Sequence, residues 1–206
     1  MKTYLGDAVL FNRLSDAFEP ATIFQGLDEK NFADFEKIWR PALVTRAAAF
    51  SNWDQQAEGN VQDSHWDWVG KAKAEGRFDS FAIECDGMTQ ALMLVDRRPH
   101  RARLCEKYAE LCYVELISSA PWNRIKFSAK PKYKGAGRAL IATAISLSVE
   151  LELGGRVGLH SLEESLDWYR HLDFTDCGFD ENSQMQYFEL REEAAKAFFQ
   201  PPEDQR

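Results

Sequence analysis

The stretch Lys130-Pro131-Lys132-Tyr133-Lys134-Gly135-Ala136-Gly137 decides the fold of this chain. It is basic, contains two glycines separated by one residue, and stands directly before an amphipathic helix. Glycines let a ligand approach the backbone closely, and the first N–H groups of a helix point outward, so the stretch is suited to bind an anion such as a pyrophosphate. The spacing matches neither the G-x-x-x-x-G-K-[ST] loop nor the dinucleotide-binding G-x-G-x-x-G fingerprint. Taken alone, a tight turn explains the glycines equally well.

The elements after the glycines predict a parallel crossover unit. An apolar stripe continues along the helix until Gly154-Gly155 ends it. A short strand follows at 156–160, and Ser161 has the S-x-x-E spacing that caps a second helix through Leu172. A strand, a helix, a strand and a helix in this order place the two strands in parallel. Two more elements are predicted, a strand over Gln184–Leu190 and a helix over Glu192–Phe199.

The elements before the glycines predict antiparallel strands preceded by helices. The turn dipeptide Asp86-Gly87 joins a strand at Phe81–Cys85 to its partner at Thr89–Val95. Arg97-Arg98-Pro99-His100 breaks the pattern, and a third strand follows at Leu111–Ile117. The first 75 residues are predicted to be helical and connecting material, with one helix from Asp28 until Pro41 interrupts it and a second from Asp63 to Gly76.

These elements together predict an α/β (α+β) fold. It has a mixed, mostly antiparallel sheet with a central parallel strand pair and helices on both faces. We expect a single domain over residues 1–200 and a frayed tail over 201–206.

Composition narrows the range of partners. The 206 residues include 25 Lys and Arg and 33 Asp and Glu, a net charge of −8, which disfavours a broad basic surface for nucleic acid and favours a cationic partner. The apolar stretch 139–153 is too short to span a membrane, and the N-terminus has no secretory signal, so we expect a soluble, cytoplasmic protein. The four cysteines and four histidines lack metal-ligand spacing, and no metal is expected.

Two motifs resemble those of the GNAT superfamily of acyl-CoA-dependent N-acetyltransferases. Lys132 to Gly137 is similar to its pyrophosphate loop, Arg/Gln-x-x-Gly-x-Gly/Ala, and Trp168-Tyr169 before Asp173-Phe174 is similar to its later aromatic-Tyr motif. The order of elements matches from about Phe78 to Leu190. The chain departs from the family pattern in Lys132, Leu162 and Asp173, and in a long connection from Ser118 to Lys130.

The resemblance implies direct transfer of an acetyl group from acetyl-CoA to a primary amine within a ternary complex. The acceptor is expected to be a small-molecule amine or a basic peptide, and a homodimer is possible through the terminal strand and Phe198-Phe199. By the same resemblance, the residues that bind the cofactor are Leu116, Ile117, Ser118, Lys132, Lys134, Gly135, Ala136, Gly137 and Arg138. One alternative is a catalytically silent acyl-CoA-binding regulatory module. A toxin-like acylase of aminoacyl-tRNA is a third, which the acidic composition disfavours.

Two residues are predicted to be catalytic. The resemblance makes Tyr169 the general acid for the leaving thiolate, although its helical spacing to Leu162 and Leu166 also fits a core aromatic. Glu115 shares a strand face with Leu111, Tyr113 and Ile117, and burial among apolar neighbours would suit its carboxylate to accept a proton. A structural ion pair with a nearby Arg, or a place at a sheet edge, is the alternative for Glu115.

Other polar residues near these positions have weaker assignments. His160 could be a second-sphere proton carrier, but a structural role is the preferred interpretation. Ser161 is predicted to cap a helix rather than to act as a nucleophile. Trp122, Asn123 and Arg124 could line the acceptor pocket, or they could form a surface excursion.

Overall fold

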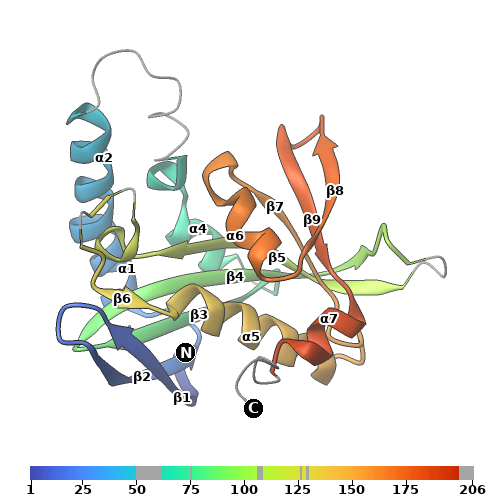
Figure 1. Cartoon of the computed structure of the whole chain (residues 1–206), viewed down its shortest axis with the longest axis horizontal. Coiled ribbons are helices and arrows are strands. Elements are labelled where there is room, and N and C mark those ends of the chain that lie inside the picture. Colours follow the sequence, from blue (N-terminus) through green and yellow to red (C-terminus); the bar gives the residue numbers. More distant parts are fainter. Residues whose placement is uncertain (50–61, 75, 106–108, 126, 129, 200–206) are drawn as a thin grey trace. The chain divides into compact units, whose positions relative to one another are not determined.

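The computed structural model describes residues 1–49, 62–74, 76–105, 109–125, 127–128 and 130–199. The strands in this part of the chain follow the hydrogen-bonded order β6-β1-β2-β3-β4-β5-β7-β9-β8 (Figure 1). β5 and β7 pair in parallel, whereas the pairs β1–β2, β2–β3, β7–β9 and β8–β9 are antiparallel. The predicted mixed, mostly antiparallel sheet with a central parallel pair is confirmed.

The bounds of the elements are as follows. The strands are β1 (Thr3–Asn12), β2 (Ala17–Gln25), β3 (Phe78–Cys85), β4 (Met88–Arg101), β5 (Glu110–Ser119), β6 (Tyr133–Lys134), β7 (Val157–Ser161), β8 (Thr175–Asp180) and β9 (Met185–Leu190). The α-helices are α1 (Glu29–Asp34), α2 (Arg40–Ala49), α4 (Trp68–Lys73), α5 (Ala136–Glu150), α6 (Leu166–His171) and α7 (Glu192–Ala197). The other helical turns are η1 (Phe35–Trp39), η2 (Gln62–His65), η3 (Pro121–Asn123) and η4 (Glu163–Ser165).

The chain divides into two compact units. The first comprises Met1–Val95 and Leu116–Leu140, and the second comprises Asp96–Glu115 and Ile141–Arg206. Strands β4 and β5 and helix α5 each begin in one unit and end in the other. A single domain over residues 1–200 stays a prediction, and the tail 201–206 lies outside the described residues.

A continuous helical segment covers β3 and β4 in the first unit. α1, the π-helix η1 and α2 follow one another from Glu29 to Ala49 (Figure 1). The aromatic rings of Phe35, Trp39 and Trp68 are fully buried, and they form one core cluster with strand residues. These strand residues are Phe78, Ala82, Leu92, Leu94 and Leu116.

The predicted interruption at Pro41 is wrong, because the helix continues to Ala49. Proline removes one backbone donor, and its ring crowds the preceding turn of a regular helix. Here a wider π-helical turn comes directly before it, in which the Arg40 N–H donates to the Phe35 carbonyl. Pro41 therefore enters as the second residue of α2, where a missing N–H costs little.

Residues 1–25 correct the prediction that the N-terminal region consists of helices and connecting material. β1 and β2 form an antiparallel hairpin in which Thr3 pairs with Gln25 and Asn12 pairs with Ala17. The hairpin keeps several large apolar side chains on its exposed surface, among them Val9 and Phe18. Since apolar and polar residues do not alternate between a buried and an exposed face, periodicity could not reveal these strands.

The β3–β4 hairpin confirms one prediction and corrects another. Asp86 and Gly87 both have positive φ, 53° and 67°, as a two-residue hairpin turn requires. β4 does not end before Arg97 as predicted but runs to Arg101 through Pro99. β3 has eight residues and β4 has fourteen, so the end of β4 extends beyond the start of β3. A proline is tolerated where a strand has no partner to receive its N–H.

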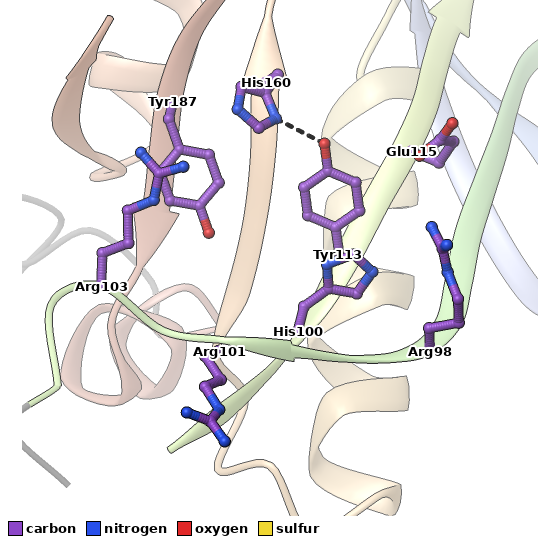
Figure 2. Close-up of a pocket in the computed structure, with 8 residues that line it drawn as sticks. All are labelled: Arg98, His100, Arg101, Arg103, Tyr113, Glu115, His160 and Tyr187. Atoms are coloured by element: carbon purple, nitrogen blue, oxygen red, sulfur yellow. Dashed lines mark hydrogen bonds between the residues drawn. The ribbon is translucent and has the colours of Figure 1, made fainter. Parts of the chain in front are cut away.

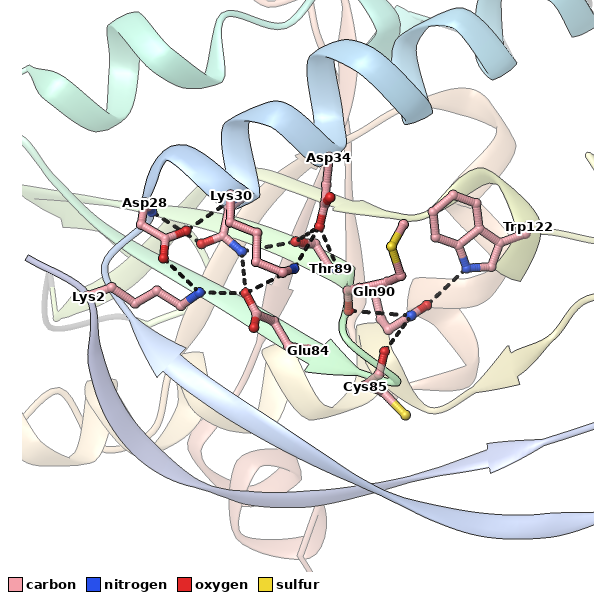
Figure 3. A network of polar contacts seen from close by, with 11 residues as sticks. Lys2, Asp28, Lys30, Asp34, Glu84, Cys85, Thr89, Gln90 and Trp122 are labelled. Carbon is pink, nitrogen blue, oxygen red and sulfur yellow. Dashed lines mark hydrogen bonds and ion pairs between the residues drawn. The ribbon is translucent and has the colours of Figure 1, made fainter.

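Buried polar groups fix α1 to the same hairpin (Figure 3). The Asp34 carboxylate accepts hydrogen bonds from the Thr89 N–H (2.9 Å) and hydroxyl (2.6 Å), and Lys30 Nζ lies 2.8 Å from it. The Asn31 amide donates to Thr89 Oγ1 at 2.9 Å and to Glu84 at 2.7 Å. Because the buried partners satisfy one another, this part of the core is polar without leaving these groups unpaired.

The second unit contains the parallel pair and the C-terminal strands. β8, which the sequence pattern did not predict, pairs with β9 through a register shift between Asp176 and Phe179. The predicted capping role of Ser161 is wrong, because it is the buried last residue of β7 and donates to the Leu162 carbonyl at 2.8 Å. The next element is the short turn η4 rather than a helix capped by Ser161.

No helix among the described residues combines the length and the apolar character needed to cross a membrane.

Candidate functional site

The glycine turn lies between β6 and α5 in the first unit. β6 adds to the edge of the sheet by pairing with β1, where Lys134 stands opposite Phe11. Gly135 follows with φ +112°, a backbone conformation that residues other than glycine rarely adopt. The first i→i−4 bond of α5 runs from the Ala139 N–H to the Gly135 carbonyl (2.9 Å), so the N–H groups of Ala136 and Gly137 come before the helical ladder. This arrangement presents donors to an anion.

The charges around this turn are not equivalent. Lys132 Nζ lies 2.9 Å from the Asp86 carboxylate of the β3–β4 turn, so its charge is paired. Lys134 is exposed and makes no ion pair with any described residue. Of the cofactor-binding residues predicted from the resemblance, the structure places six together in this turn: Lys132, Lys134, Gly135, Ala136, Gly137 and Arg138.

A chain of side-chain hydrogen bonds holds the turn in place. Gln90, buried in β4, accepts from Trp122 Nε1 at 3.0 Å (Figure 3). It also accepts from the Asn123 amide at 3.0 Å. Asn123 Oδ1 in turn accepts from the Tyr133 N–H at 2.9 Å, and the Tyr133 hydroxyl donates to Glu19 at 2.7 Å. Trp122 and Asn123, considered above as acceptor contacts, thus anchor the long connection to the first unit.

The remaining predicted cofactor residues lie near the end of β5. Its parallel ladder with β7 ends at Val114 and Leu159, while β5 continues to Ser119. Leu116 is buried in the first unit's core, and Ile117 is half-buried. The Ser118 hydroxyl donates to the buried Asp63 carboxylate (2.8 Å), which also pairs with Arg124. The side chain of Ser118 is therefore committed to a structural network.

A polar pocket of about 270 Å³ lies in the second unit (Figure 2). Its walls come from β4 and the residues after it, and from β5, β7 and β9. The lining side chains are Arg98, His100, Arg101, Arg103, Tyr113, Glu115, His160 and Tyr187. Almost all of them carry a group that can donate or accept a proton.

Three side chains in and behind the pocket form a continuous chain. The Tyr113 hydroxyl lies 2.6 Å from His160 Nδ1, as Figure 2 shows. On its other side, His160 Nε2 lies 3.3 Å from Asp180 Oδ2, and Arg103 donates to the same oxygen at 2.5 Å. Arg103 also stacks on Tyr187, with its guanidinium carbon 4.0 Å from the ring centroid.

The opposite wall of the pocket is built on Asp96. This buried carboxylate accepts two hydrogen bonds from Arg98 Nε and one from Arg98 Nη2 (2.5 Å), and His100 Nε2 lies 3.5 Å away. The His100 ring stacks on Tyr113 at a centroid distance of 4.3 Å. Burial raises the pKa of Asp96, but the Arg98 hydrogen bonds outweigh it and hold that pKa below its usual range.

The surroundings of Tyr113, His160 and Asp180 shift the pKa of each of these side chains. Burial lowers the pKa of His160, against the opposing effect of Asp180, so the imidazole is neutral at pH 7. Burial, reinforced by Glu115, raises the pKa of Tyr113, which keeps its proton. The hydrogen bond from Arg103 holds the pKa of Asp180 well below its usual range.

The two predicted catalytic residues both lie in the second unit. Glu115 lines the polar pocket instead of lying in the apolar environment expected for it, and its catalytic role stays a prediction. Tyr169 is buried in α6 and packs against Phe174 and Phe188 at centroid distances of 5.5 and 5.8 Å. Burial raises the pKa of Tyr169.

Sequence reasoning missed most of the pocket. Arg98 and His100 were assigned to a break, whereas they belong to β4 together with Arg101. A signal for the other wall was present, since Tyr113 alternates with Glu115 on one strand and His160 lies next to the end of the strand parallel to it. No cluster of His, Cys, Asp or Glu suited to a metal ion occurs among the described residues.

The sequence matches no protein-family model and no curated protein. Solved structures do match. The PaiA N-acetyltransferase from Thermoplasma acidophilum in complex with coenzyme A is 9% identical over 82% of this chain and 98% of that chain, with a TM-score of 0.51. An N-acetyltransferase from Staphylococcus aureus Mu50 (14% identity) and an acyl-CoA N-acyltransferase from Pseudomonas aeruginosa (13%) each cover 82% of this chain and 97% of theirs, both with a TM-score of 0.46.

At these identities the likeness bears on the fold. The PaiA match, with its TM-score of 0.51, therefore shows that the chain has the fold of the GNAT acetyltransferases.

Proposed function

We propose that this protein is an N-acetyltransferase that moves an acetyl group from acetyl-CoA to a primary amine by direct transfer. The observation that carries the proposal is Gly135, held at φ +112° directly before the first turn of α5, in a chain with the GNAT fold. The backbone there turns its first N–H groups toward a ligand, as a pyrophosphate needs.

The glycine turn fits the phosphate part of coenzyme A. Ala136 and Gly137 contribute backbone N–H donors, Lys134 contributes an exposed charge, and β6 fixes the turn against β1. When bound, acetyl-CoA supplies the thioester whose acyl carbon the amine attacks. The backbone of Leu116 to Ser118, at the end of β5 beyond its ladder with β7, would pair with the pantetheine part.

The polar pocket is the proposed acceptor site. Among the described residues that line it, Glu115 is the acidic one and would hold the acceptor's ammonium group. Arg98, Arg101 and Arg103 line the other walls with guanidinium donors, of which Arg98 and Arg103 are ion-paired with Asp96 and Asp180. A small amine that also carries an oxygen acceptor or an anionic group suits these walls better than a strongly basic peptide does.

The experiment measures thiol release from acetyl-CoA with spermidine, tyramine, lysine and the peptide Lys-Gly-Gly as acceptors, with mass spectrometry of the products. We expect turnover with at least one amine. Coenzyme A that raises the melting temperature without turnover across such amines would instead favour a silent acyl-CoA-binding module. No stabilisation by coenzyme A would contradict both functions.

A Gly135→Ala variant tests the turn directly. The contacts of a new Cβ would be ordinary, the shortest being 3.7 Å, so the cost comes from φ. That cost of about 1–2 kcal/mol should raise the KM for acetyl-CoA roughly 5- to 30-fold. Gly76→Ala is the control, since it also places an alanine at positive φ (+70°) with nothing within 4 Å of the new Cβ. An equal KM for both variants would remove the turn from cofactor binding.

A further inference from the structure

We propose that Tyr113, His160 and Asp180 form a proton relay that removes a proton from the acceptor's ammonium group, with Tyr113 as the residue that contacts the amine. The inference rests on the proposed function and names the base of that same site. It differs from the assignment made from sequence, in which Glu115 takes the proton.

The geometry fixes the direction of the relay. An ionised Asp180 can only accept, so the hydrogen between it and His160 belongs to Nε2. Nδ1 of the neutral ring then has a lone pair, and it accepts from the Tyr113 hydroxyl at 2.6 Å. Tyr113 therefore donates to His160, and His160 donates to Asp180. The tyrosine oxygen retains lone pairs for a donor in the pocket.

Two further contacts keep the relay rigid. Arg103 holds Asp180 Oδ2 at 2.5 Å, and its own backbone N–H donates to Glu189 at 2.6 Å. His100 stacks on Tyr113 with an interplanar angle of 17°. A base whose orientation is fixed before the substrate arrives does not have to be ordered in the transition state.

The proton balance is complete. An N–H bond of the ammonium breaks and its proton passes to Tyr113 Oη, while the tyrosine's own proton passes to His160 Nδ1 and gives an imidazolium beside Asp180. The electron pair left on nitrogen forms the C–N bond to the acyl carbon, and the C–S bond breaks. Tyr169 protonates the departing thiolate and is reprotonated by the second proton from the nitrogen, and the imidazolium releases its extra proton to solvent. Tyr113 remains neutral, in agreement with its raised pKa.

The pH dependence follows from the groups around His160. From β5 these are Tyr113 and Glu115, from β4 and the residues after it Arg98, His100, Arg101 and Arg103, from β8 Asp180, and from β9 Tyr187. Since burial lowers the pKa of His160, the relay accepts protons at neutral pH and fails when acid protonates the ring. Loss of Asp180 removes an influence that raises this pKa, so the acid limb of the rate profile moves to lower pH.

Imidazole ¹⁵N chemical shifts test the relay without activity. In the full-length protein, assigned with His160→Gln, we expect Nε2 protonated and Nδ1 unprotonated at pH 7. Asp180→Asn should loosen this tautomer preference, whereas Asp176→Asn, the same change on the same strand outside the pocket, should leave it intact. A proton on Nδ1 in the wild type would reverse the Tyr113 hydrogen bond and overturn the relay.

The kinetic test uses acetyl-CoA with the best amine of the series named above. His160→Gln and Tyr113→Phe should each lower kcat/KM about 100-fold, as expected for loss of a general base. His171→Gln, on the exposed surface of α6, should equal the wild type. Asp180→Asn should lower the rate and move the acid limb to lower pH, which a merely structural role would not do.

The outcomes separate the two proposals. Wild-type turnover that persists in His160→Gln, together with loss of the acid limb in Glu115→Gln, would overturn the relay and leave the proposed function standing. A wild-type protein that acetylates no amine would overturn both. Melting temperatures of all variants near that of the wild type ensure that a rate loss is not a loss of folding.

Discussion

Lys132 and Lys134 lie two positions apart, but an acidic neighbour neutralises the charge of Lys132. Lys132 pairs with Asp86 at 2.9 Å, whereas Lys134 is exposed on the edge strand β6. The basic stretch that marks the turn in the sequence therefore does not present all its charges equally. An anion at the start of α5 would meet the charge of Lys134 but compete with Asp86 for that of Lys132.

We therefore expect different effects from removing the two side chains. Lys134→Ala should raise the KM for acetyl-CoA about 2- to 5-fold, the size of an exposed ion pair, and the effect should fade at high salt. Lys132→Ala should change it less than about 2-fold, since its charge is already neutralised. Steady-state kinetics at low and high salt measure both, and a larger effect at Lys132 would contradict this account.

The buried side chain of Tyr169 leads to a second prediction. Its ring is packed among aromatic side chains, but its hydroxyl makes no hydrogen bond to any described residue. The raised pKa keeps the hydroxyl protonated, as a general acid must be. Tyr169→Phe, which preserves the packing, should lower kcat about 100-fold and leave the affinity for coenzyme A nearly unchanged. Unchanged turnover would show that Tyr169 packs in the core and has no catalytic role.

Among the elements, the connection between β5 and α5 fixes the position of the glycine turn. Its 3-10 turn η3 presents Asn123 to two groups, the Gln90 side chain and the Tyr133 N–H. A loop that carries a binding turn gains precision when its own conformation is fixed by packing and hydrogen bonds. The length of the connection allows it to reach the buried glutamine in β4.

We expect Asn123→Ala to lower the free energy of unfolding by about 1–3 kcal/mol, since it leaves buried hydrogen-bonding groups unpaired. The KM for acetyl-CoA should rise several-fold while kcat at saturation stays close to the wild type. Trp122→Phe, which removes the indole N–H together with part of the ring, should show the same trend more weakly. Denaturant titration measures the free energy of unfolding of both variants, and steady-state kinetics measures their KM. An unchanged KM in Asn123→Ala would show that the glycine turn keeps its conformation without the Asn123 hydrogen bonds.

For the molecule as a whole, acid should act in two stages. Burial lowers the pKa of His160, so the folded state resists protonation and stability falls once the pH drops below the unfolded value of about 6.5. Burial raises the pKa of Asp34, but Lys30 and Thr89 outweigh it and the net shift is downward. That contribution is present above about pH 4 and is lost as the pH falls further.

Urea unfolding between pH 8 and pH 3 measures both stages. His160→Gln should remove the first, and Asp34→Asn should flatten the second at a lower overall stability. A stability that does not change between pH 7 and pH 5 in the wild type would contradict the first stage.

The limits of prediction from the sequence are visible in particular elements. The Asp86-Gly87 turn and the glycines before α5 were found because they need backbone conformations that few residues adopt. β1 and β2 were missed because their apolar residues do not separate onto a buried face, and the end of β4 because Pro99 normally breaks strands. The pocket unites residues from four strands, and no local pattern encodes such a meeting.

The pairing of β6 with β1 also sets an order of events in folding. Phe11 and Lys134 lie opposite one another but far apart in the chain, so the strand that supports the glycine turn closes a very long loop. Contacts of this kind form late, because the entropy of closure is lost before they stabilise anything. On the ribosome, β1, β2 and the β3–β4 hairpin have emerged long before β6 is made. A growing chain thus has β1 well before β6 and the glycine turn are made, and the edge of β1 is open to misplaced strand pairing in between.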